Sequence, residues 1–498
     1  MDRRTWGKQV GALASAAAVC AWRRPAAAAA DGSNNGRPKY IFINETADHR
    51  HDLAFKMSLK LAEKRAGVEN ALVLLPRLPP ATTLEQVAVD LFERWKIGRS
   101  RGGKGLLYVY AQQENRFRIE VSYALEGALP DAYCRRLEDA AQTYMLSEIP
   151  QDFISELIIT MNLRAAGERD GADGLAARPE WMTTRFLSGG GGVSAKGYAP
   201  TLEDYQAAVQ TLPPAAVRDF QPAASPEEAV RRYLASLELG LGDPRLPLLT
   251  SGSRIFRAVV PRNAAQQRRV ASYFERAMPY QLVQGDELAY AVFRPGVPNL
   301  PIVLRRGRDA LWYVDEPKSW TFFHRFEDGT DFYPKFDDLP LLGALQRLHL
   351  PHALEPIYRQ RVVTPPVLPY PVDLNGIVAD IQAQIAKNPG DARLHAALAD
   401  VYFFEMNWLA RALASYESAA RLAPDRLEYR WRLVDLYLNS SQIEPFLAEL
   451  GALARQLPRD ATAQQWYRYY RDAYTFKPGE FFATREGGTV AIAASQRR

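Results

Sequence analysis

One stretch of the chain, residues 84–131, constrains the fold more than any other. Its first part, residues 84–96, predicts an amphipathic helix, because apolar side chains recur there at helical spacing. A turn broken by four glycines follows. Two short apolar segments come next, residues 106–110 and 117–123, and a polar turn separates them. Strands this close in sequence are expected to pair as an antiparallel hairpin.

The neighbouring segments extend this pattern into a domain of alternating strands and helices. Residues 40–43 and 71–75 read as strands, and three further segments, 52–65, 131–147 and 151–166, read as helices. Alternation of this kind predicts a sheet with helices on both faces. A helix that bridges two strands favours a mixed sheet with at least one parallel pair. We therefore expect an α/β domain over residues 40–185.

The residues at the corners of this region resemble the TPM-domain family of envelope and thylakoid-lumen proteins. Its members have a helix that ends in W-x-I-G, then D-N-G-V-L-L, then E-V-G-Y-G-L-E-G-x-L-T-D. The shared positions in this chain are Trp95, Ile97, Gly98, Gly105, Leu106, Leu107, Glu120, Val121, Tyr123, Leu125, Glu126, Gly127, Leu129 and Asp131. The resemblance implies a TPM-like fold for residues 40–185.

The resemblance also implies chemistry, since TPM domains are linked to acid-phosphatase activity and to divalent-metal binding by acidic loop residues. Asp131 keeps an oxygen ligand, and Glu45 stands roughly where the family has an early Asp. Together with Glu126 they are the expected metal ligands, close together if the family fold holds. The family's Asp-Asn pair is replaced by Gly103 and Lys104. Calcium needs about six to eight oxygen ligands, so we expect at most weak Ca²⁺ or Mg²⁺ binding.

The N-terminus, residues 1–30, predicts an export signal with cleavage near Ala30. A basic start precedes a short apolar run, and Arg3 and Arg4 resemble a twin-arginine motif, with a general secretory signal as the alternative. The apolar run is too short for a membrane span, which needs about 20 residues. We expect a periplasmic or equivalent envelope location. Cys134 would then be the single cysteine of the mature chain, which excludes an intramolecular disulfide.

Net charge gives no reason to expect a nucleic-acid partner. The chain carries a formal charge of +5, but residues 1–30 hold five basic side chains and one acidic side chain. Removing them leaves a mature chain of about +1, too little for an electrostatic footprint on nucleic acid.

The middle of the chain predicts a second domain. A glycine-rich linker, residues 186–224, leads into residues 225–335, where a helix begins at Ser225 with a capping box and Pro226 at its first position. Several strands follow, so this α+β domain resembles the cone-shaped NTF2-like domains, although without a shared motif. Such cones can hold an apolar ligand, but we expect aromatic residues such as Trp312 and Phe322 to form core instead.

A proline-rich linker, residues 363–373, precedes a helical repeat over residues 374–475. Prolines at positions 389, 424 and 458 are spaced by 35 and 34 residues, the period of tetratricopeptide repeats. The pattern therefore predicts an all-α, tetratricopeptide-like array. Such an array binds protein partners or packs on the rest of its own chain. For the binding alternative, the expected partner-contacting residues are Tyr402, Tyr416 and Tyr437.

No catalytic residue is assigned from the sequence. The chain has no nucleophile elbow, no H-E-x-x-H and no dinucleotide fingerprint, and His49 and His51 read as a surface pair. Two hypotheses follow. We favour an exported, non-catalytic scaffold that helps assemble or maintain an envelope protein complex, in peripheral contact with membrane complexes. The alternative is a metal-assisted phosphatase that works through Glu45, Glu126 and Asp131.

Overall fold

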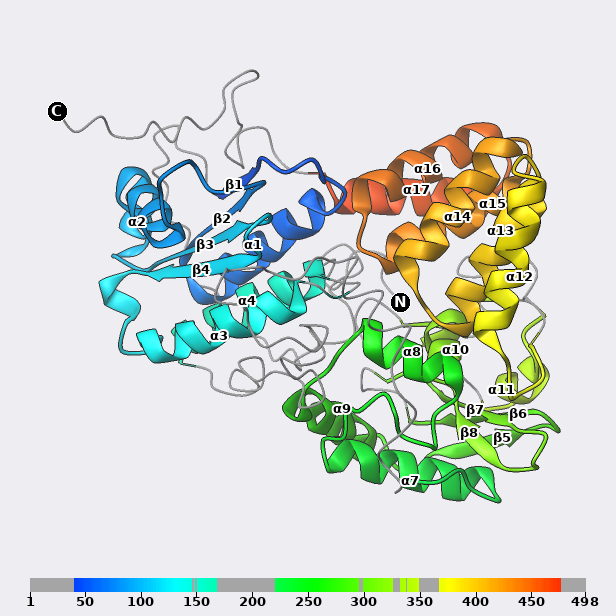
Figure 1. Ribbon diagram of the computed structural model, residues 1–498. Coiled ribbons are helices and arrows are strands. Elements are labelled where there is room, and N and C mark those ends of the chain that lie inside the picture. Colours follow the sequence, from blue (N-terminus) through cyan, green and yellow to red (C-terminus); the bar gives the residue numbers. More distant parts are fainter. Residues whose placement is uncertain are drawn as a thin grey trace. The chain divides into compact units, whose positions relative to one another are not determined.

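The computed structural model divides the chain into two compact units (Figure 1). The described residues are 40–145, 147, 150–167, 220–294, 299–325, 332–336, 338–348 and 367–475. One unit, the N-terminal domain, comprises residues 40–145 and 150–167, and the other, the C-terminal unit, holds the described residues from 220 to 473. The export signal and most of the glycine-rich linker lie outside the described residues. No helix in the described ranges is long and apolar enough to span a membrane.

The N-terminal domain contains the mixed sheet that the sequence predicts. Its strands lie in chain order, the first three run parallel, and the fourth pairs antiparallel with the third. Their bounds are β1 (Ile41–Asn44), β2 (Glu69–Leu75), β3 (Gly105–Ala111) and β4 (Arg116–Val121). In the β3–β4 hairpin, Leu106 lies opposite Val121 and Ala111 opposite Arg116. The predicted hairpin and the predicted parallel pairing are both confirmed.

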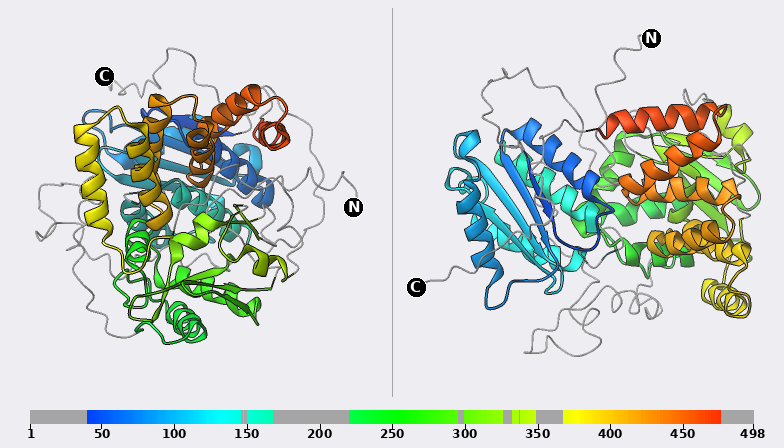
Figure 2. Two further views of the ribbon diagram at one scale, coloured as in Figure 1. Left: turned by 90° about the vertical axis from the view of Figure 1, so that its right-hand side faces the viewer. Right: turned by 90° about the horizontal axis from the view of Figure 1, so that it is seen from above.

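Helices cover both faces of this sheet, as expected (Figure 2). One face packs against α1 (Asp52–Ala66), α3 (Asp131–Tyr144) and α4 (Pro150–Ala165), and the other packs against α2 (Leu84–Trp95). The α2 helix begins with a capping box, in which Thr83 accepts from the Gln86 amide. Since β2 and β3 are buried on both faces, they read as continuous apolar runs rather than as alternating ones.

The middle part of the C-terminal unit is an α+β domain. Helices α7 (Pro226–Glu238) and α9 (Ala264–Arg276) pack on a four-stranded antiparallel meander, and α8 (Ser251–Val259) lies between them in the chain. The strands are β5 (Gln281–Gln284), β6 (Leu288–Val292), β7 (Ile302–Arg306) and β8 (Trp312–Val314). Short elements follow: α10 (Glu316–Phe322), the β9 (Phe323–Arg325) and β10 (Phe332–Pro334) hairpin, and α11 (Leu342–Gln346).

Two local predictions for this domain concern the start of α7 and the aromatic residues. The Ser225 hydroxyl accepts from the Glu228 backbone amide and Pro226 lies in the first helical turn, so the predicted cap and proline are confirmed. The Glu228 carboxylate binds Arg231 and Arg232, so the second half of the predicted capping box is not formed. Trp312, Phe322 and Phe323 are buried, so these aromatic residues are core rather than the lining of a ligand pocket. The NTF2-like resemblance itself stays a prediction.

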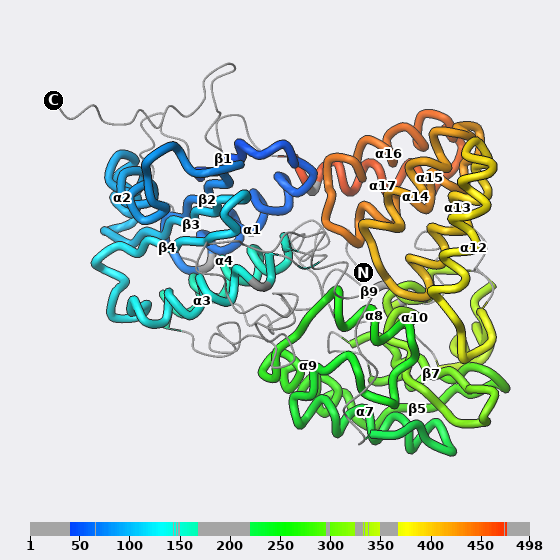
Figure 3. Tube along the Cα trace, viewed as in Figure 1, coloured from blue at the N-terminus to red at the C-terminus, as the bar shows by residue number. Residues whose placement is uncertain are grey.

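The remainder of the C-terminal unit is a helical array. Consecutive helices pack on one another, and the chain runs up and down through them (Figure 3). They are α12 (Leu374–Lys387), α13 (Ala392–Asp400), α14 (Leu409–Leu422), α15 (Leu427–Asn439), α16 (Ile443–Gln456) and α17 (Ala461–Ala473). A π-helical turn (Val401–Glu405) extends α13. The predicted C-terminal helices are present, and their assignment as tetratricopeptide repeats stays a prediction.

Two motif glycines of the N-terminal domain allow a close backbone contact. Gly98 has a φ of 92°, which favours glycine, and a Cβ added there would lie 2.8 Å from the Gly105 nitrogen. A Cβ added to Gly105 would lie 2.6 Å from the Gly98 nitrogen. Real Cβ atoms do not approach backbone this closely. Both positions therefore serve the packing of the loop after α2 against the start of β3.

Replacing Gly105 by Ala should destabilise the N-terminal domain, because backbone on both sides has to move. We expect the free energy of unfolding to fall by about 1–3 kcal/mol, as measured by urea denaturation with hydrogen exchange of β3 as the local readout. Gly127→Ala is the matched control, since an added Cβ there meets nothing within 4 Å. Equal stability of the two variants would contradict this account.

Candidate functional site

The loop after α2 is held in place by a buried carboxylate. Glu69, the first residue of β2, is buried, and its Oε2 accepts from the Gly98 amide at 3.0 Å. The same oxygen accepts from the Ser100 hydroxyl at 2.7 Å and from the Ser100 amide at 3.4 Å. Glu69 was not among the residues predicted from the sequence. The available signal was an acidic residue just before the apolar run of β2.

The structure separates Glu45 from the other two predicted metal ligands. Glu45 directly follows β1, and its amide donates to the Leu74 carbonyl near the carboxyl end of β2. Glu126 and Asp131 follow β4, whose last residue Val121 lies opposite Leu106 near the start of β3. They therefore lie at the opposite end of the strands. The expected grouping is wrong because β4 runs antiparallel to the other strands, so the carboxyl ends of β1 and β4 lie at opposite ends of the sheet.

Glu126 and Asp131 themselves are both exposed, and Asp131 lies in the first turn of α3. The loop that carries them adjoins the glycine-broken loop, because a Cβ added to Gly103 would lie 3.6 Å from the Ala124 Cβ. Gly103 has no side chain that could supply a ligand to this loop. Over the described residues, no group of three or more His, Cys, Asp or Glu side chains is placed to hold a metal ion.

Glu120 belongs to a structural network. It pairs with Arg118 on the same strand at 2.7 Å, and Arg118 reaches the Glu138 carboxylate of α3 at 3.4 Å. Glu138 also accepts from the Ile119 amide at 2.8 Å, and burial raises its pKa. These contacts fasten α3 to the edge strand β4, which accounts for Glu120 without a catalytic role.

At the carboxyl edge of the sheet, polar groups bind one another. Asn44 donates to Asp52 at 2.8 Å, and His49 lies 3.1 Å from the second Asp52 oxygen. Hydrogen bonds from Arg50 lower the pKa of Asp48 to about 2. Ligands bind at the carboxyl end of the strands in many α/β sheets. Here the side chains of residues 44–52 hydrogen-bond to one another and fix the start of α1.

A comparison with known families now bears on this domain. Residues 52–148 match the TPM domain. The match covers 97 of the 498 residues. It begins at α1 and ends just after α3, so β1 and Glu45 precede it. No curated protein matches the chain.

Cys134, on α3 of the N-terminal domain, is a poor candidate nucleophile. Its thiol is buried, and that burial raises its pKa to about 12. A thiol with so high a pKa carries almost no thiolate at neutral pH and is a poor nucleophile. The sequence interpretation of Cys134 as a small apolar core residue agrees with this burial.

In the C-terminal unit, the array docks on the middle domain through its π-helical turn. Lys318 of α10 is buried, and its ammonium group donates to the Phe404 carbonyl at 2.9 Å and to Glu405 at 2.7 Å. On the other side, a Cβ added to Gly252 of α8 would lie 1.7 Å from the Glu405 carbonyl oxygen. Only glycine permits this approach, so α8 and the turn are in direct backbone contact.

Glu405 also joins this contact to the sheet. Arg305 of β7 lies 3.1 Å from Glu405 and 3.3 Å from Asp315, and all three side chains are buried. Burial opposes the ionisation of Glu405, but Lys318 and Arg305 together outweigh it and hold its pKa below the usual range. The cluster of Arg305, Asp315, Lys318 and Glu405 thus contains two cations and two carboxylates, and we call it the buried charge cluster.

A second buried ion pair joins α15 of the array to the middle domain. Lys335 lies 3.1 Å from Asp435, and both side chains are buried. Arg432, also on α15, stacks over the rings of Phe336 and Phe404. Burial lowers the pKa of Lys335 from its ordinary value of 10.5. At a pH between the lowered pKa of the folded state and the ordinary value of 10.5, Lys335 is protonated more in the unfolded chain than in the folded one. The contribution of Lys335 to stability therefore rises as the pH approaches 10.5.

The burial of two predicted partner-binding tyrosines disagrees with their expected role. Tyr402 and Tyr416 are buried, and the Tyr416 hydroxyl donates to Asp400, so both belong to the core of the array. They match the repeat pattern because that pattern describes packing between helices. Tyr437 is half-buried, and its hydroxyl donates to Glu417 at 2.9 Å on the surface. It is the one of the three that a partner can reach.

Replacing Asp435 by Asn should loosen the array from the middle domain, because it leaves the Lys335 cation buried without its counter-charge. Breaking a buried pair in this way costs about 3–5 kcal/mol, so the urea midpoint of the C-terminal unit and the protection of α15 amides should both fall. The double variant Lys335→Met/Asp435→Asn should recover part of the loss. A single variant as stable as the parent would show that the pair does not hold the array.

Proposed function

We propose that this protein is an exported, non-catalytic scaffold that helps assemble or maintain an envelope protein complex. The observation that carries the proposal is the docked array. Its π-helical turn and α15 are fixed to the middle domain by the buried charge cluster and by the Lys335–Asp435 pair. Part of the array therefore packs on its own chain, which is one of the two alternatives that the sequence left open. The rest of the array, held rigid by this docking, is the part that we propose binds a partner. Rigidity reduces the ordering cost of binding.

The surface left for the partner lies on α14 and on the part of α15 that carries Tyr437. The principal contacts of α14 and α16 are with neighbouring helices of the array, whereas α15 and the π-helical turn bind the middle domain. Glu417 of α14 is exposed, and Tyr437 of α15 bonds to it. We place the protein-binding surface around this pair. Tyrosine is among the residues that dominate binding at interfaces.

The phosphatase alternative draws on the TPM match and on the retained Asp131. Phosphoester hydrolysis at such a site needs an ion that activates water and neutralises the developing charge. Glu126 and Asp131 are the candidate ligands at one end of the sheet. Glu45, the third predicted ligand, lies at the other end and is too far away to complete the site. Two exposed carboxylates are few for a hard cation. We therefore rank this function second.

A phosphoester assay separates the two functions. The signal-free protein, incubated with p-nitrophenyl phosphate and Mg²⁺ or Ca²⁺, should release no nitrophenol above the rate of an Asp131→Asn variant. Calorimetric titration with either ion should show no binding tighter than about 10⁻⁴ M. Hydrolysis that requires the ion and disappears in Asp131→Asn would overturn the scaffold proposal.

The partner surface can be tested by site-specific photo-crosslinking in the native envelope. A photoreactive residue in place of Tyr437 should crosslink one recurrent protein. The same residue at Tyr123, which is 87% exposed in the TPM domain, is the matched control for a merely exposed aromatic side chain. The proposal fails if position 437 captures no protein or only those that position 123 also captures.

A further inference from the structure

Two charged turns lie at the same end of the middle-domain sheet. The meander β5–β6–β7–β8 is antiparallel throughout, so its first and third turns share one end. The first turn carries Asp286 and Glu287, the third carries Arg308, and Arg306 is the last residue of β7 before that third turn. The Arg306 amide donates to the Glu287 carbonyl at 2.8 Å, which fixes the two turns to each other. Two carboxylates and two guanidinium groups therefore stand at neighbouring turns.

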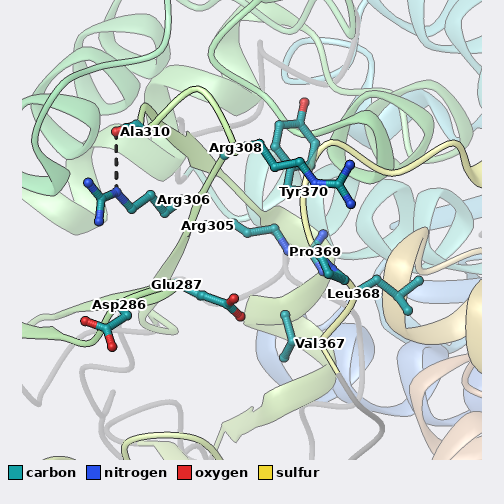
Figure 4. A pocket seen from close by; sticks show the side chains of 11 residues that line it. Asp286, Glu287, Arg305, Arg306, Arg308, Ala310, Val367, Leu368, Pro369 and Tyr370 are labelled. Atoms are coloured by element: carbon teal, nitrogen blue, oxygen red, sulfur yellow. Dashed lines mark hydrogen bonds between the residues drawn. The ribbon is translucent and has the colours of Figure 1, made fainter.

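The proline-rich linker closes a third side of this region. Tyr370 forms a parallel bridge with Gly307, and its carbonyl accepts from the Arg308 amide at 3.0 Å. The rings of Tyr370 and Tyr313 lie 4.6 Å apart. The two turns and residues 367–370 line an open pocket of about 270 Å³ (Figure 4). The linker was expected to be an extended spacer, and here its described part is a wall of a binding-sized cavity.

The opposite charges around this cavity do not pair with one another. All four side chains are exposed, and in the described part of the chain no ion pair joins Asp286 or Glu287 to Arg306 or Arg308. Arg306 turns instead towards the Ala310 carbonyl, at 3.5 Å. Arg305, which also lines the cavity, already has its counter-charges in the buried charge cluster. The cavity thus keeps two anionic and two cationic groups apart.

We propose that this cavity binds a small zwitterion of amino-acid or dipeptide size. Its carboxylate would lie against the guanidinium of Arg308, and its ammonium group against the carboxylate of Glu287. A simple anion is disfavoured by Asp286 and Glu287, and a simple cation by the arginines, whereas a zwitterion satisfies both. Charge-assisted hydrogen bonds are the stronger class. The cavity is just below the range of about 300–1,000 Å³ for drug-sized ligands, which limits the ligand to this size.

The test uses three probes with the full signal-free chain, followed by calorimetry or ligand-observed NMR. They are alanylalanine, its N-acetyl derivative, which keeps only the carboxylate, and its amide, which keeps only the ammonium group. Alanylalanine should bind saturably, and each blocked probe should bind about tenfold more weakly. Glu287→Gln should lower the affinity for alanylalanine to that for the N-acetyl probe, and it should leave the affinity for the N-acetyl probe unchanged. Arg308→Gln should lower the affinity for alanylalanine to that for the amide probe, and it should leave the affinity for the amide probe unchanged.

Arg231→Gln is the control, because Arg231 is an exposed arginine of α7 that pairs with Glu228 away from the cavity lining. It should leave all three affinities unchanged. The inference is overturned if alanylalanine does not bind at concentrations up to about 10 mM. It is equally overturned if the blocked probes bind as tightly, or if neither Glu287→Gln nor Arg308→Gln changes the affinity. None of these results bears on the array surface around Tyr437, so the scaffold proposal is tested separately.

Discussion

The C-terminal unit depends on the buried charge cluster of Arg305, Asp315, Lys318 and Glu405. Taking four charges out of water is costly, and only close mutual pairing offsets that cost. Glu405 comes from the π-helical turn of the array, and the other three members of the cluster come from the middle domain, with Arg305 100 residues and Lys318 87 residues before Glu405. Without Glu405 the middle domain would bury two cations against the single carboxylate of Asp315. The array and the middle domain are therefore expected to form one cooperative body, which is what a rigid binding arm requires.

Two motif glycines of the N-terminal domain have a different role, which is to fix the backbone. Gly98 and Gly105 permit a contact that no side chain would allow, and Glu69 accepts three hydrogen bonds from the same loop. Two of the positions shared with the family, Gly98 and Gly105, thus follow from the geometry at one end of the sheet. Chemistry at that end would require acidic groups, and the chain has Gly103 and Lys104 where the family has two of its polar residues.

The candidate sites show where sequence reasoning stops. Glu45, Glu126 and Asp131 were grouped by chemical type and by analogy, but proximity depends on strand direction, and the reversal at β4 separates Glu45 from the others. Tyr402 and Tyr416 fit a repeat pattern, yet that pattern marks packed positions as well as exposed ones. The cavity beside the proline-rich linker has no sequence signal, because its walls come from three segments that meet only in the folded chain.

The sequence by itself determined the local elements: the alternating strands and helices of the TPM domain, its hairpin, the cap at Ser225 and the C-terminal helices. These follow from periodicity, caps and turn residues, which act over a few neighbouring positions. Only the tertiary structure decided which charges meet. Lys335 with Asp435 and Arg305 with Glu405 are pairs 100 residues apart. Each looks like an ordinary surface charge in the sequence, because burial and partner choice arise from packing between distant segments.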